Sequence, residues 1–465
     1  MTKLFGTDGM RGEAGVFPLD PRTVETVGAS LATRLKNKLG RPPLIVIGRD
    51  TRESGEWLEQ ALVAGTERAG AQWKSAGVIT TPGVAFLART IPADAGIVIS
   101  ASHNAYTDNG LKIFAPSGRK LEEETERSIE ADIFAELDQP STEGASKEPP
   151  ATPPVTPQAS VNAEAELRGR YLDFLFKDIG QQLDLHGTKL VLDCANGAAS
   201  GLAPELFQRL GATVTTISNQ PDGRNINLGC GSLHMEALQR EVLEQKADLG
   251  VAFDGDADRS LFVDSKGQLI NGDATLWILA RYMQERRQLR HYTVVATVMS
   301  NIGLEVALKS QGLRLVRTDV GDKYVLEELV RLGASLGGEQ SGHLIFPNVS
   351  LAGDGLITTL CVLRAMIEQG KALHELTEGF ENFPQILVNV VVREKQPFTE
   401  VAAIRKAAQE IEKDLGSRGR LLLRYSGTES LARVMIEGDN QTTIEKHANR
   451  LAGVIQMSLG AQAVI

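Results

Sequence analysis

Three stretches of this chain share one plan, and the plan limits the fold more than any other feature of the sequence. Each stretch opens on a short β-branched run, continues into a helix-like pattern, and then reaches a second and a third strand. Strands that alternate with helical segments predict α/β units with largely parallel sheets. The opening runs lie at 44–47, 190–192 and 293–296, and the second strands lie around 78–79, 214–217 and 313–316.

A loop rich in functional side chains follows the third strand of each unit. Ligands of open α/β sheets bind just beyond the carboxyl ends of the strands. A single polar loop would be compatible with an ordinary turn, but three equivalent loops indicate a site. These loops are 100–104, 254–259 and 338–343.

The last part of the chain follows a different plan. A strand at 386–392, a helix at 398–415, a hairpin of strands at 420–424 and 431–436, and a helix at 442–459 predict a small α+β domain. The expected fold class is α/β, with three similar mixed α/β units followed by this smaller α+β domain, arranged around a central cleft.

Length and composition suggest where the domains divide. A chain of 465 residues is expected to form three or four domains of ~100–150 residues each. Six of its 18 prolines fall within 139–160, which predicts a linker or surface excursion without a packed core. The expected domains are 1–138, 161–262, 263–378 and 379–465, with the linker at 139–160.

Charge and cysteine usage exclude several classes of partner. The formal charge of −10 argues against a nucleic-acid binder, which would show a basic excess. No apolar run approaches the ~20 residues of a membrane span, and no secretory h-region is present. The three cysteines, Cys194, Cys230 and Cys361, are widely spaced and lack a C-x-x-C pair. They predict reduced thiols in a cytoplasmic protein.

The carboxylates in the second loop are the sharpest chemical signal. Asp254, Asp256 and Asp258 alternate with small residues, so an extended backbone aims them at a common point. Three carboxylates at such short separations must share a cation or be protonated. Ligation by oxygen alone favours Mg²⁺, which leaves room for phosphate oxygens. A calcium EF-hand is excluded, because Arg259 occupies the place of its glycine and Ser265 that of its bidentate glutamate.

The first loop offers a nucleophile. Ser102 is favoured over Ser100, because Ser100 continues the apolar run 97–99 and is expected to be buried in the strand. A serine becomes a phosphoryl carrier where a cation neutralises the phosphate that it holds. Lys112 could reach the same phosphate or take a hydroxyl proton. The sequence around Ser102 and His103 is not the G-x-S-x-G elbow of a hydrolase.

The remaining motifs indicate a sugar and a second phosphate. Short polar groups beside glycines, as in Glu339, Ser341 and His343, suit the hydroxyls of a polyol. Turn amides, hydroxyls and guanidinium groups form an anion nest. That nest comprises Arg424, Ser426, Gly427, Thr428 and Arg433.

The cations near the start of the chain could meet the transferred phosphate. Arg11 lies on the glycine-flexible segment 5–12, and Arg52 and Lys323 are lesser candidates. A nucleotide donor is excluded, since neither G-x-x-x-x-G-K-[ST] nor a G-x-G-x-x-G after a strand occurs.

Taken together, these motifs resemble those of the α-D-phosphohexomutase superfamily over almost the whole chain. A phosphoserine loop, D-G-D-x-D-R, G-E-x-S-G-H and R-x-S-G-T-E occur in the family's order. The opening F-G-T-D-G-x-R-G and Gln340 are most similar to the bacterial phosphoglucosamine mutases. Ala105 stands where the family's serine loop usually has proline, which removes one source of rigidity.

The resemblance implies a role for each motif residue. Ser102 would be the phosphoserine and, with Asp254, Asp256 and Asp258, would bind one Mg²⁺ per chain. Arg11, Lys112 and His103 would be catalytic. Arg259, Glu339, Ser341 and His343 would bind the sugar, while Arg424, Ser426, Gly427, Thr428 and Arg433 would hold the distal phosphate.

The implied reaction is an isomerisation between glucosamine 6-phosphate and glucosamine 1-phosphate, through a 1,6-bisphosphate that turns over and returns its other phosphoryl group to Ser102. The product would feed UDP-N-acetylglucosamine and cell-wall precursor synthesis. Glucose or glucosamine 1,6-bisphosphate would act as activator, and the protein would be a monomer or homodimer without nucleic-acid or membrane partners. A phosphomannomutase/phosphoglucomutase and a serine-dependent sugar phosphatase are the alternatives.

Overall fold

The chain is divided into two compact units. The first comprises 1–298 and 316–378, and the second comprises 299–315 and 379–465. The computed structural model describes residues 3–6, 8–138, 157–426 and 429–460. Within these ranges, no helix is both long and apolar enough to cross a membrane.

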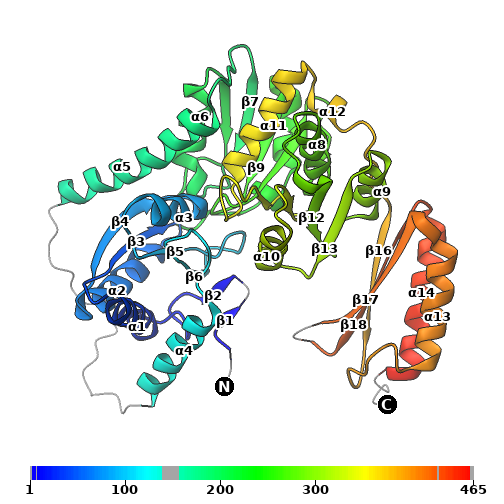
Figure 1. Ribbon diagram of the computed structural model, residues 1–465, viewed down its shortest axis with the longest axis horizontal. Helices are drawn as coiled ribbons and strands as arrows, with labels where there is room; N and C mark the ends of the chain where they lie inside the picture. The colour runs from blue at the N-terminus through cyan, green and yellow to red at the C-terminus, as the bar shows by residue number, and fades with distance from the viewer. Residues whose placement is uncertain (1–2, 7, 139–156, 427–428, 461–465) are drawn as a thin grey trace. The chain divides into compact units, whose positions relative to one another are not determined.

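A six-stranded mixed sheet opens the first unit (Figure 1). Its strand order is β1-β2-β6-β5-β3-β4. The strands are β1 (Phe5–Gly6), β2 (Gly9–Glu13), β3 (Leu44–Arg49), β4 (Gln72–Val78), β5 (Ala95–Ile99) and β6 (Asp108–Phe114). The helices are α1 (Pro21–Leu39), α2 (Gly55–Arg68), α3 (Thr81–Thr90) and α4 (Glu123–Leu137).

Two further sheets follow in the same unit. The second has the order β11-β10-β9-β7-β8 and the third β13-β12-β14-β15. The second contains β7 (Lys189–Asp193), β8 (Thr213–Ile217), β9 (Leu249–Phe253), β10 (Ser260–Asp264) and β11 (Leu269–Ile270), with helices α5 (Pro157–Phe174), α6 (Ala203–Arg209) and α7 (Glu236–Gln245). The third contains β12 (Thr293–Thr297), β13 (Arg314–Thr318), β14 (Gly337–Gly338) and β15 (Leu344–Ile345), with helices α8 (Gly272–Glu285), α10 (Asp322–Leu332), α11 (Gly355–Gln369) and α12 (Leu373–Leu376).

The three sheets place their chemically loaded loops at equivalent points. β5, β9 and β14 run parallel to β3, β7 and β12, respectively, and each is antiparallel to the next strand along the chain. Each loop is therefore a chain reversal at the carboxyl end of a buried strand, where ligands of α/β sheets bind. The mixed α/β units expected from the sequence are present.

Side-chain caps define where the helices that frame these loops begin. Asp354 caps α11: its Oδ1 accepts hydrogen bonds from the backbone N–H of Leu356 at 2.9 Å and of Ile357 at 3.0 Å. Its Oδ2 accepts one from the Tyr171 hydroxyl on α5 at 2.6 Å. Both side chains are buried. The cap therefore also joins α5 to α11, two helices that lie on either side of the aspartate loop (254–259) in the sequence. Burial raises the pKa of Asp354 to about 6.

The second unit contains a three-stranded antiparallel sheet of order β16-β18-β17. Helices α13 and α14 lie side by side against this sheet (Figure 1). The strands are β16 (Gln385–Val391), β17 (Gly419–Tyr425) and β18 (Leu431–Gly438), and the helices are α9 (Ile302–Ser310), α13 (Ala402–Leu415) and α14 (Gln441–Leu459).

Two sequence-based boundaries differ in the structure. The helix expected from residue 398 begins at Ala402, because Phe398 stacks on Tyr425 with ring centroids 4.1 Å apart instead of entering the helix. The expected linker 139–160 lies largely outside the described residues. α5 begins at Pro157, so the last four residues of that segment belong to a helix. Proline is compatible with this first helical turn, where its missing N–H is not needed.

Candidate active site

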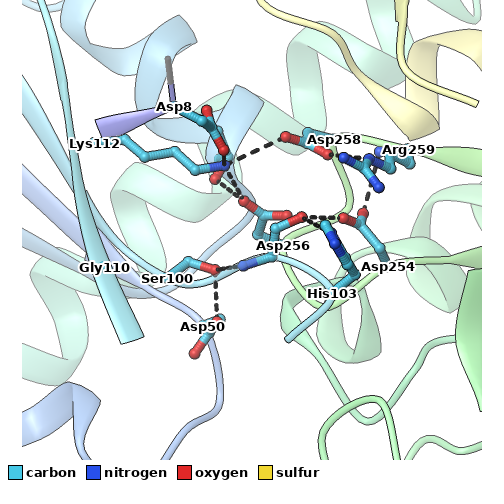
Figure 2. Close-up of polar contacts among 12 residues, drawn as sticks. Asp8, Asp50, Ser100, His103, Gly110, Lys112, Asp254, Asp256, Asp258 and Arg259 are labelled. Carbon is cyan, nitrogen blue, oxygen red and sulfur yellow. Dashed lines mark hydrogen bonds and ion pairs between the residues drawn. The ribbon is translucent and has the colours of Figure 1, made fainter. Parts of the chain in front are cut away.

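A buried cluster of three carboxylates lies at the centre of the site in the first unit (Figure 2). The aspartate cluster, Asp254, Asp256 and Asp258, follows β9, and its side-chain ligand atoms all lie within 4.8 Å of one another. Asp254 and Asp256 are fully buried, and Asp258 is 6% exposed. The three carboxylates come together as expected, but on a turn between β9 and β10 in which Ala257 has a φ of 54°, not on the extended backbone expected from the sequence.

The electrostatics of the aspartate cluster fit a cation. Burial, reinforced by the charges of Asp258 and Asp256, raises the pKa of Asp254 well above its usual range. Among the described residues, Oδ1 of Asp256 and Oδ1 of Asp258 are buried and have no hydrogen-bond partner. Such oxygens are costly to leave unpaired, and oxygen ligands suit a hard divalent cation. The aspartate cluster can hold a metal ion.

Ser102 lies directly against this cluster. It follows β5, is 1% exposed, and its hydroxyl donates a hydrogen bond to Oδ2 of Asp254 at 2.5 Å. His103 Nδ1 lies 3.4 Å from the same hydroxyl. Burial, with the charges of Arg259 and Arg11, lowers the pKa of His103 to about 4. A contact between residues 152 positions apart thus joins the first two loops.

Ser100, the rival nucleophile, has a different environment. It is fully buried, donates a hydrogen bond to Oδ2 of Asp50 at 2.6 Å, and accepts one from the backbone N–H of Ser102 at 2.9 Å. Both hydrogen bonds of the Ser100 hydroxyl thus support the loop that carries Ser102, and this hydroxyl contacts Asp50 where that of Ser102 contacts Asp254.

Gly255, between Asp254 and Asp256, is at a position where no side chain would fit. A Cβ atom at this position would lie 2.5 Å from the carbonyl oxygen of Ser102 and 2.9 Å from the amide nitrogen of Asn227. Any side chain here would push the serine loop (residues 100–107) away from the carboxylates. Glycine allows the two backbones to approach closely.

Lys112, on β6, adds a buried positive charge. Its Nζ lies 2.8 Å from Oδ2 of Asp256, 3.4 Å from Oδ2 of Asp258 and 3.2 Å from Oδ2 of Asp8. Burial alone would lower the pKa of Lys112, but the charges of Asp256, Asp8 and Asp258 outweigh it and raise the pKa well above the usual value. The lysine is thus charged. It approaches Asp256 from the side opposite to Asp254, the carboxylate that Ser102 contacts (Figure 2).

A cavity of about 460 Å³ adjoins the aspartate cluster. Arg11 pairs with Asp8, and its Nε has no hydrogen-bond partner among the described residues. The lining side chains come from all three α/β sheets. They include Asp8, Arg11, His103, Asp258, Arg259, Asp322, Glu339 and His343.

The sugar loop (residues 338–343) borders the same cavity. His343 is 5% exposed, and its Nδ1 lies 3.6 Å from Oδ1 of Asp258. Burial opposes protonation, but the nearby negative charge of Asp258 raises the pKa of His343 to about 9. Glu339 Oε1 accepts a hydrogen bond from Gly321 N at 3.2 Å. The Ser341 hydroxyl is buried and has no hydrogen-bond partner in the described part of the chain.

Arg259 links the aspartate cluster to this cavity. Its backbone N–H donates to Oδ1 of Asp254 at 3.2 Å, and its Nε lies 3.8 Å from Oδ1 of Asp258. The guanidinium group is therefore placed between the carboxylates and the space where a ligand would bind.

The second unit carries the predicted anion nest. Arg424 and Arg433 stand directly opposite each other on β17 and β18, an arrangement of like charges that is unfavourable without an anion. Arg433 lies 3.4 Å from the Ser426 hydroxyl and 3.2 Å from Oε2 of Glu429, and its Nε is buried without a hydrogen-bond partner among the described residues. Gly427 and Thr428 lie outside the described residues.

The two lesser candidates differ in their surroundings. Arg52 is 1% exposed and binds the backbone carbonyls of Ser102, Asn104 and Asp108, so its guanidinium group is engaged by the backbone. Lys323 pairs with Glu123 and lines a cavity that Lys112 and His343 also line. Its contact with a transferred phosphate stays a prediction.

Several residues near the site were missed in the sequence. Asp8 contacts Lys112, Lys120 and Arg11, and Lys120 also pairs with Asp322 at 2.6 Å. The spacing of Asp8 three residues before Arg11, within a glycine-rich segment, could have indicated an acid paired with a base. The other contacts join residues more than 100 positions apart, and no local pattern marks them.

Models of one protein family match nearly the whole chain. The alpha/beta/alpha domains I, II and III of the phosphoglucomutase/phosphomannomutase family match residues 2–140, 169–267 and 271–383, and the C-terminal domain matches 387–454. A phosphoglucosamine mutase from Solibacter usitatus is 50% identical over 98% of this chain and 99% of its own length. One from Koribacter versatilis is 47% identical over 98% of this chain and 97% of its own length.

The chain belongs to the phosphoglucosamine mutases of this family. The fold of this mutase is also found in solved structures of lower identity. A phosphoglucomutase/phosphomannomutase family protein from Burkholderia thailandensis matches with a TM-score of 0.77, 22% identity and coverage of 98% of this chain and 97% of that chain. An N-acetylphosphoglucosamine mutase from Aspergillus fumigatus, solved with GlcNAc-6P and magnesium, matches with a TM-score of 0.63, 17% identity and coverage of 98% and 95%.

The superfamily resemblance and the fold class are thereby confirmed. The mutase is an isomerase of the phosphohexomutase type, and its substrate is a small phosphosugar.

Proposed function

We propose that this mutase interconverts glucosamine 6-phosphate and glucosamine 1-phosphate through a phosphorylated Ser102 and a 1,6-bisphosphate intermediate. The observation that carries the proposal is the 2.5 Å hydrogen bond from the Ser102 hydroxyl to Asp254. It places a nucleophile against buried carboxylates that can hold a cation. The identity of 45–50% to phosphoglucosamine mutases over nearly the full length supports the substrate.

Ser102, Asp254, Asp256 and Asp258 would hold one Mg²⁺. When bound, the ion neutralises phosphate charge and orients the transferred group. Lys112 and Arg259 add fixed positive charge beside the same carboxylates, which suits a reaction that depends mainly on positioning and charge stabilisation.

In the first half-reaction, phosphoserine 102 donates its phosphoryl group to the free hydroxyl of the bound monophosphate. The bond from phosphorus to Oγ breaks, a bond to the sugar oxygen forms, and the hydroxyl proton leaves to a basic group at the site. The bisphosphate then turns over, and Oγ of Ser102 takes up the other phosphoryl group while the released sugar oxygen regains a proton. Arg11, Lys112 and His103 are the proposed groups for proton transfer and charge stabilisation.

The cavity beside the sugar loop suits an amino sugar. Glu339, Ser341 and His343 are the proposed partners of sugar hydroxyls. Asp322 and Glu339 add carboxylates to the cavity wall, and a carboxylate favours the ammonium form of a neighbouring amine. The orphaned hydroxyl of Ser341 would gain a partner from the ligand.

A direct comparison of substrates tests this proposal. The protein is first phosphorylated with a hexose 1,6-bisphosphate, and isomerisation of glucosamine, glucose and mannose phosphates is then measured in coupled assays. We expect kcat/KM for glucosamine phosphate to exceed the others by at least about 10-fold. A preference for mannose or glucose phosphate, or release of inorganic phosphate faster than isomerisation, would contradict the assignment.

Arg424, Ser426, Gly427, Thr428 and Arg433 are proposed to hold the phosphate that is not being transferred. The opposed arginines and the unpaired Nε of Arg433 support this role. Arg433→Ala is expected to raise KM about 10- to 150-fold, the equivalent of about 1.5–3 kcal/mol for one charge-assisted hydrogen bond. Steady-state kinetics measure the effect.

Arg450→Ala is the matched control, because it removes an arginine of the same unit that pairs with Glu410 on the helix face. The control should leave KM within about twofold, as is usual for surface ion pairs. Equal effects of the two substitutions, or an unchanged KM in Arg433→Ala, would refute a phosphate-binding role.

The cytoplasmic location, the oligomeric state and the 1,6-bisphosphate activator stay predictions.

A further inference from the structure

The backbone at Ser102 adopts an unfavourable conformation. Its φ is 53°, in the left-handed region that residues other than glycine rarely occupy. Such a conformation persists only where the surroundings hold it in place. Contacts from the surrounding residues must therefore fix the nucleophile.

Arg52 supplies the first set of contacts. Its side chain is 1% exposed, and its guanidinium donates hydrogen bonds to the carbonyl oxygens of Ser102 at 3.0 Å, Asn104 at 2.9 Å and Asp108 at 2.9 Å, as well as to that of Ala105. Three carbonyls of the serine loop and the carbonyl of Asp108, the first residue of β6, thus converge on one planar group. Arginine is suited to this task because it presents five donors in a fixed geometry.

The buried positive charge of Arg52 is balanced by the carboxylate of Asp50, beneath the serine loop. Asp50 is fully buried, and its Oδ2 accepts hydrogen bonds from Nε of Arg52 at 2.9 Å and from the Ser100 hydroxyl at 2.6 Å. The Ser100 oxygen in turn accepts the backbone N–H of Ser102. Asp50 is drawn beneath Ser100 in Figure 2. The N–H and the C=O of Ser102 are thus both held by this network.

Asn227, in the segment between β8 and α7, supplies a second set of contacts. Its side-chain amide donates to the carbonyl oxygens of Ser102 at 2.9 Å and Asn104 at 3.0 Å. These are two of the same oxygens that Arg52 binds. Asn227 also has a φ of 57° and is anchored through its backbone N–H to the carbonyl of Ala195 at 2.9 Å.

We propose that Arg52 and Asn227 are positioning residues, which grip the same two carbonyl oxygens and so hold Ser102 Oγ against Asp254 throughout the catalytic cycle. The inference rests on the proposed role of Ser102 as phosphoryl carrier. Because Asn227 lies on the segment that precedes the aspartate cluster, it ties the nucleophile directly to the sheet that carries the carboxylates. Neither side chain needs to touch the substrate.

Asn227→Asp is the primary test, because aspartate has the same shape and tolerates a positive φ but cannot donate to carbonyl oxygens. We expect kcat to fall about 10- to 100-fold while KM changes less than about threefold, since small displacements of a reacting group carry costs of this size. Hydrogen exchange of the amides in residues 101–108, followed by mass spectrometry, should become at least about 10-fold faster. Arg52→Lys should change both readouts in the same direction.

Asn225→Ala is the matched control in the same loop. Within the described residues, its side-chain amide donates to the carbonyl of Gln220 and its side-chain oxygen accepts the backbone N–H of Asp222, and neither contact reaches the serine loop. It should leave kcat and the exchange of residues 101–108 unchanged. An unchanged exchange rate in Asn227→Asp, or an equal effect of Asn225→Ala, would overturn the inference. The exchange measurement does not require activity, so faster exchange in a protein without isomerase activity would support the grip and reject the proposed function instead.

Discussion

Ser102→Ala is expected to reduce isomerisation by more than about 1,000-fold. The proposed reaction passes the phosphoryl group through Oγ, and the loss of a covalent nucleophile removes the whole route rather than one stabilising contact. The alanine side chain fits the buried position, so the fold should be retained. Coupled assays measure turnover, and intact-protein mass spectrometry should show no phosphorylated form after treatment with a hexose 1,6-bisphosphate.

Ser100→Ala separates the two serines of the loop. This substitution removes two hydrogen bonds, one to Asp50 and one from the backbone N–H of Ser102, and we expect it to lower kcat by no more than about 100-fold, the scale of two hydrogen bonds. The protein should still accept a phosphoryl group. Full activity in Ser102→Ala, or phosphorylation that is lost only in Ser100→Ala, would assign the nucleophile to Ser100.

Removal of divalent metal is expected to reduce turnover by more than about 100-fold, and added Mg²⁺ should restore it. Without a cation, the three carboxylates repel one another and the phosphate on Ser102 lacks its main neutralising charge. A second readout is independent of activity: Mg²⁺ at 100 times its Kd should stabilise the folded protein by about 2.7 kcal/mol, which thermal unfolding measures.

Asp256→Asn should abolish this stabilisation by Mg²⁺. The matched control is Asp264→Asn, because Asp264 is also buried but its carboxylate accepts hydrogen bonds from the backbone N–H groups of Lys266 and Gln268 in a nearby turn. The control should keep the Mg²⁺ response. Indifference of both turnover and unfolding to chelation, or loss of the response in the control alone, would argue against a metal at the aspartate cluster.

Much of the fold could be predicted because it follows from local patterns. β-branched runs followed by helical periodicity indicated three α/β units, and the different order after residue 385 indicated the smaller sheet with α13 and α14. The prediction missed details that depend on packing. α13 begins at Ala402 because Phe398 is held by Tyr425, and the interaction of two rings 27 positions apart leaves no mark in the helical pattern.

The candidate site was predictable to a lesser extent. The spacing of Asp254, Asp256 and Asp258 indicates a shared ligand, but the extended backbone inferred from it is a turn in the structure, with Ala257 at a positive φ. The role of Arg52 was not predictable: from the sequence it is a charged residue after a strand, and a solvated position or a phosphate contact is the reasonable expectation. Its burial against four backbone carbonyls depends on a loop 50 residues away.

The sequence therefore accounts for the elements, the order of the loops and the kind of chemistry that each loop can perform, because these depend on side-chain type and on periods of two to four residues. Local patterns do not account for the contact of Asn227 with the serine loop or for the unpaired oxygens of the aspartate cluster, and the proximity of Ser102 to Asp254 is expected only from the family resemblance. Those features arise where chain segments more than 100 residues apart are packed together and water is excluded, which sets both the distances and the strength of the charges.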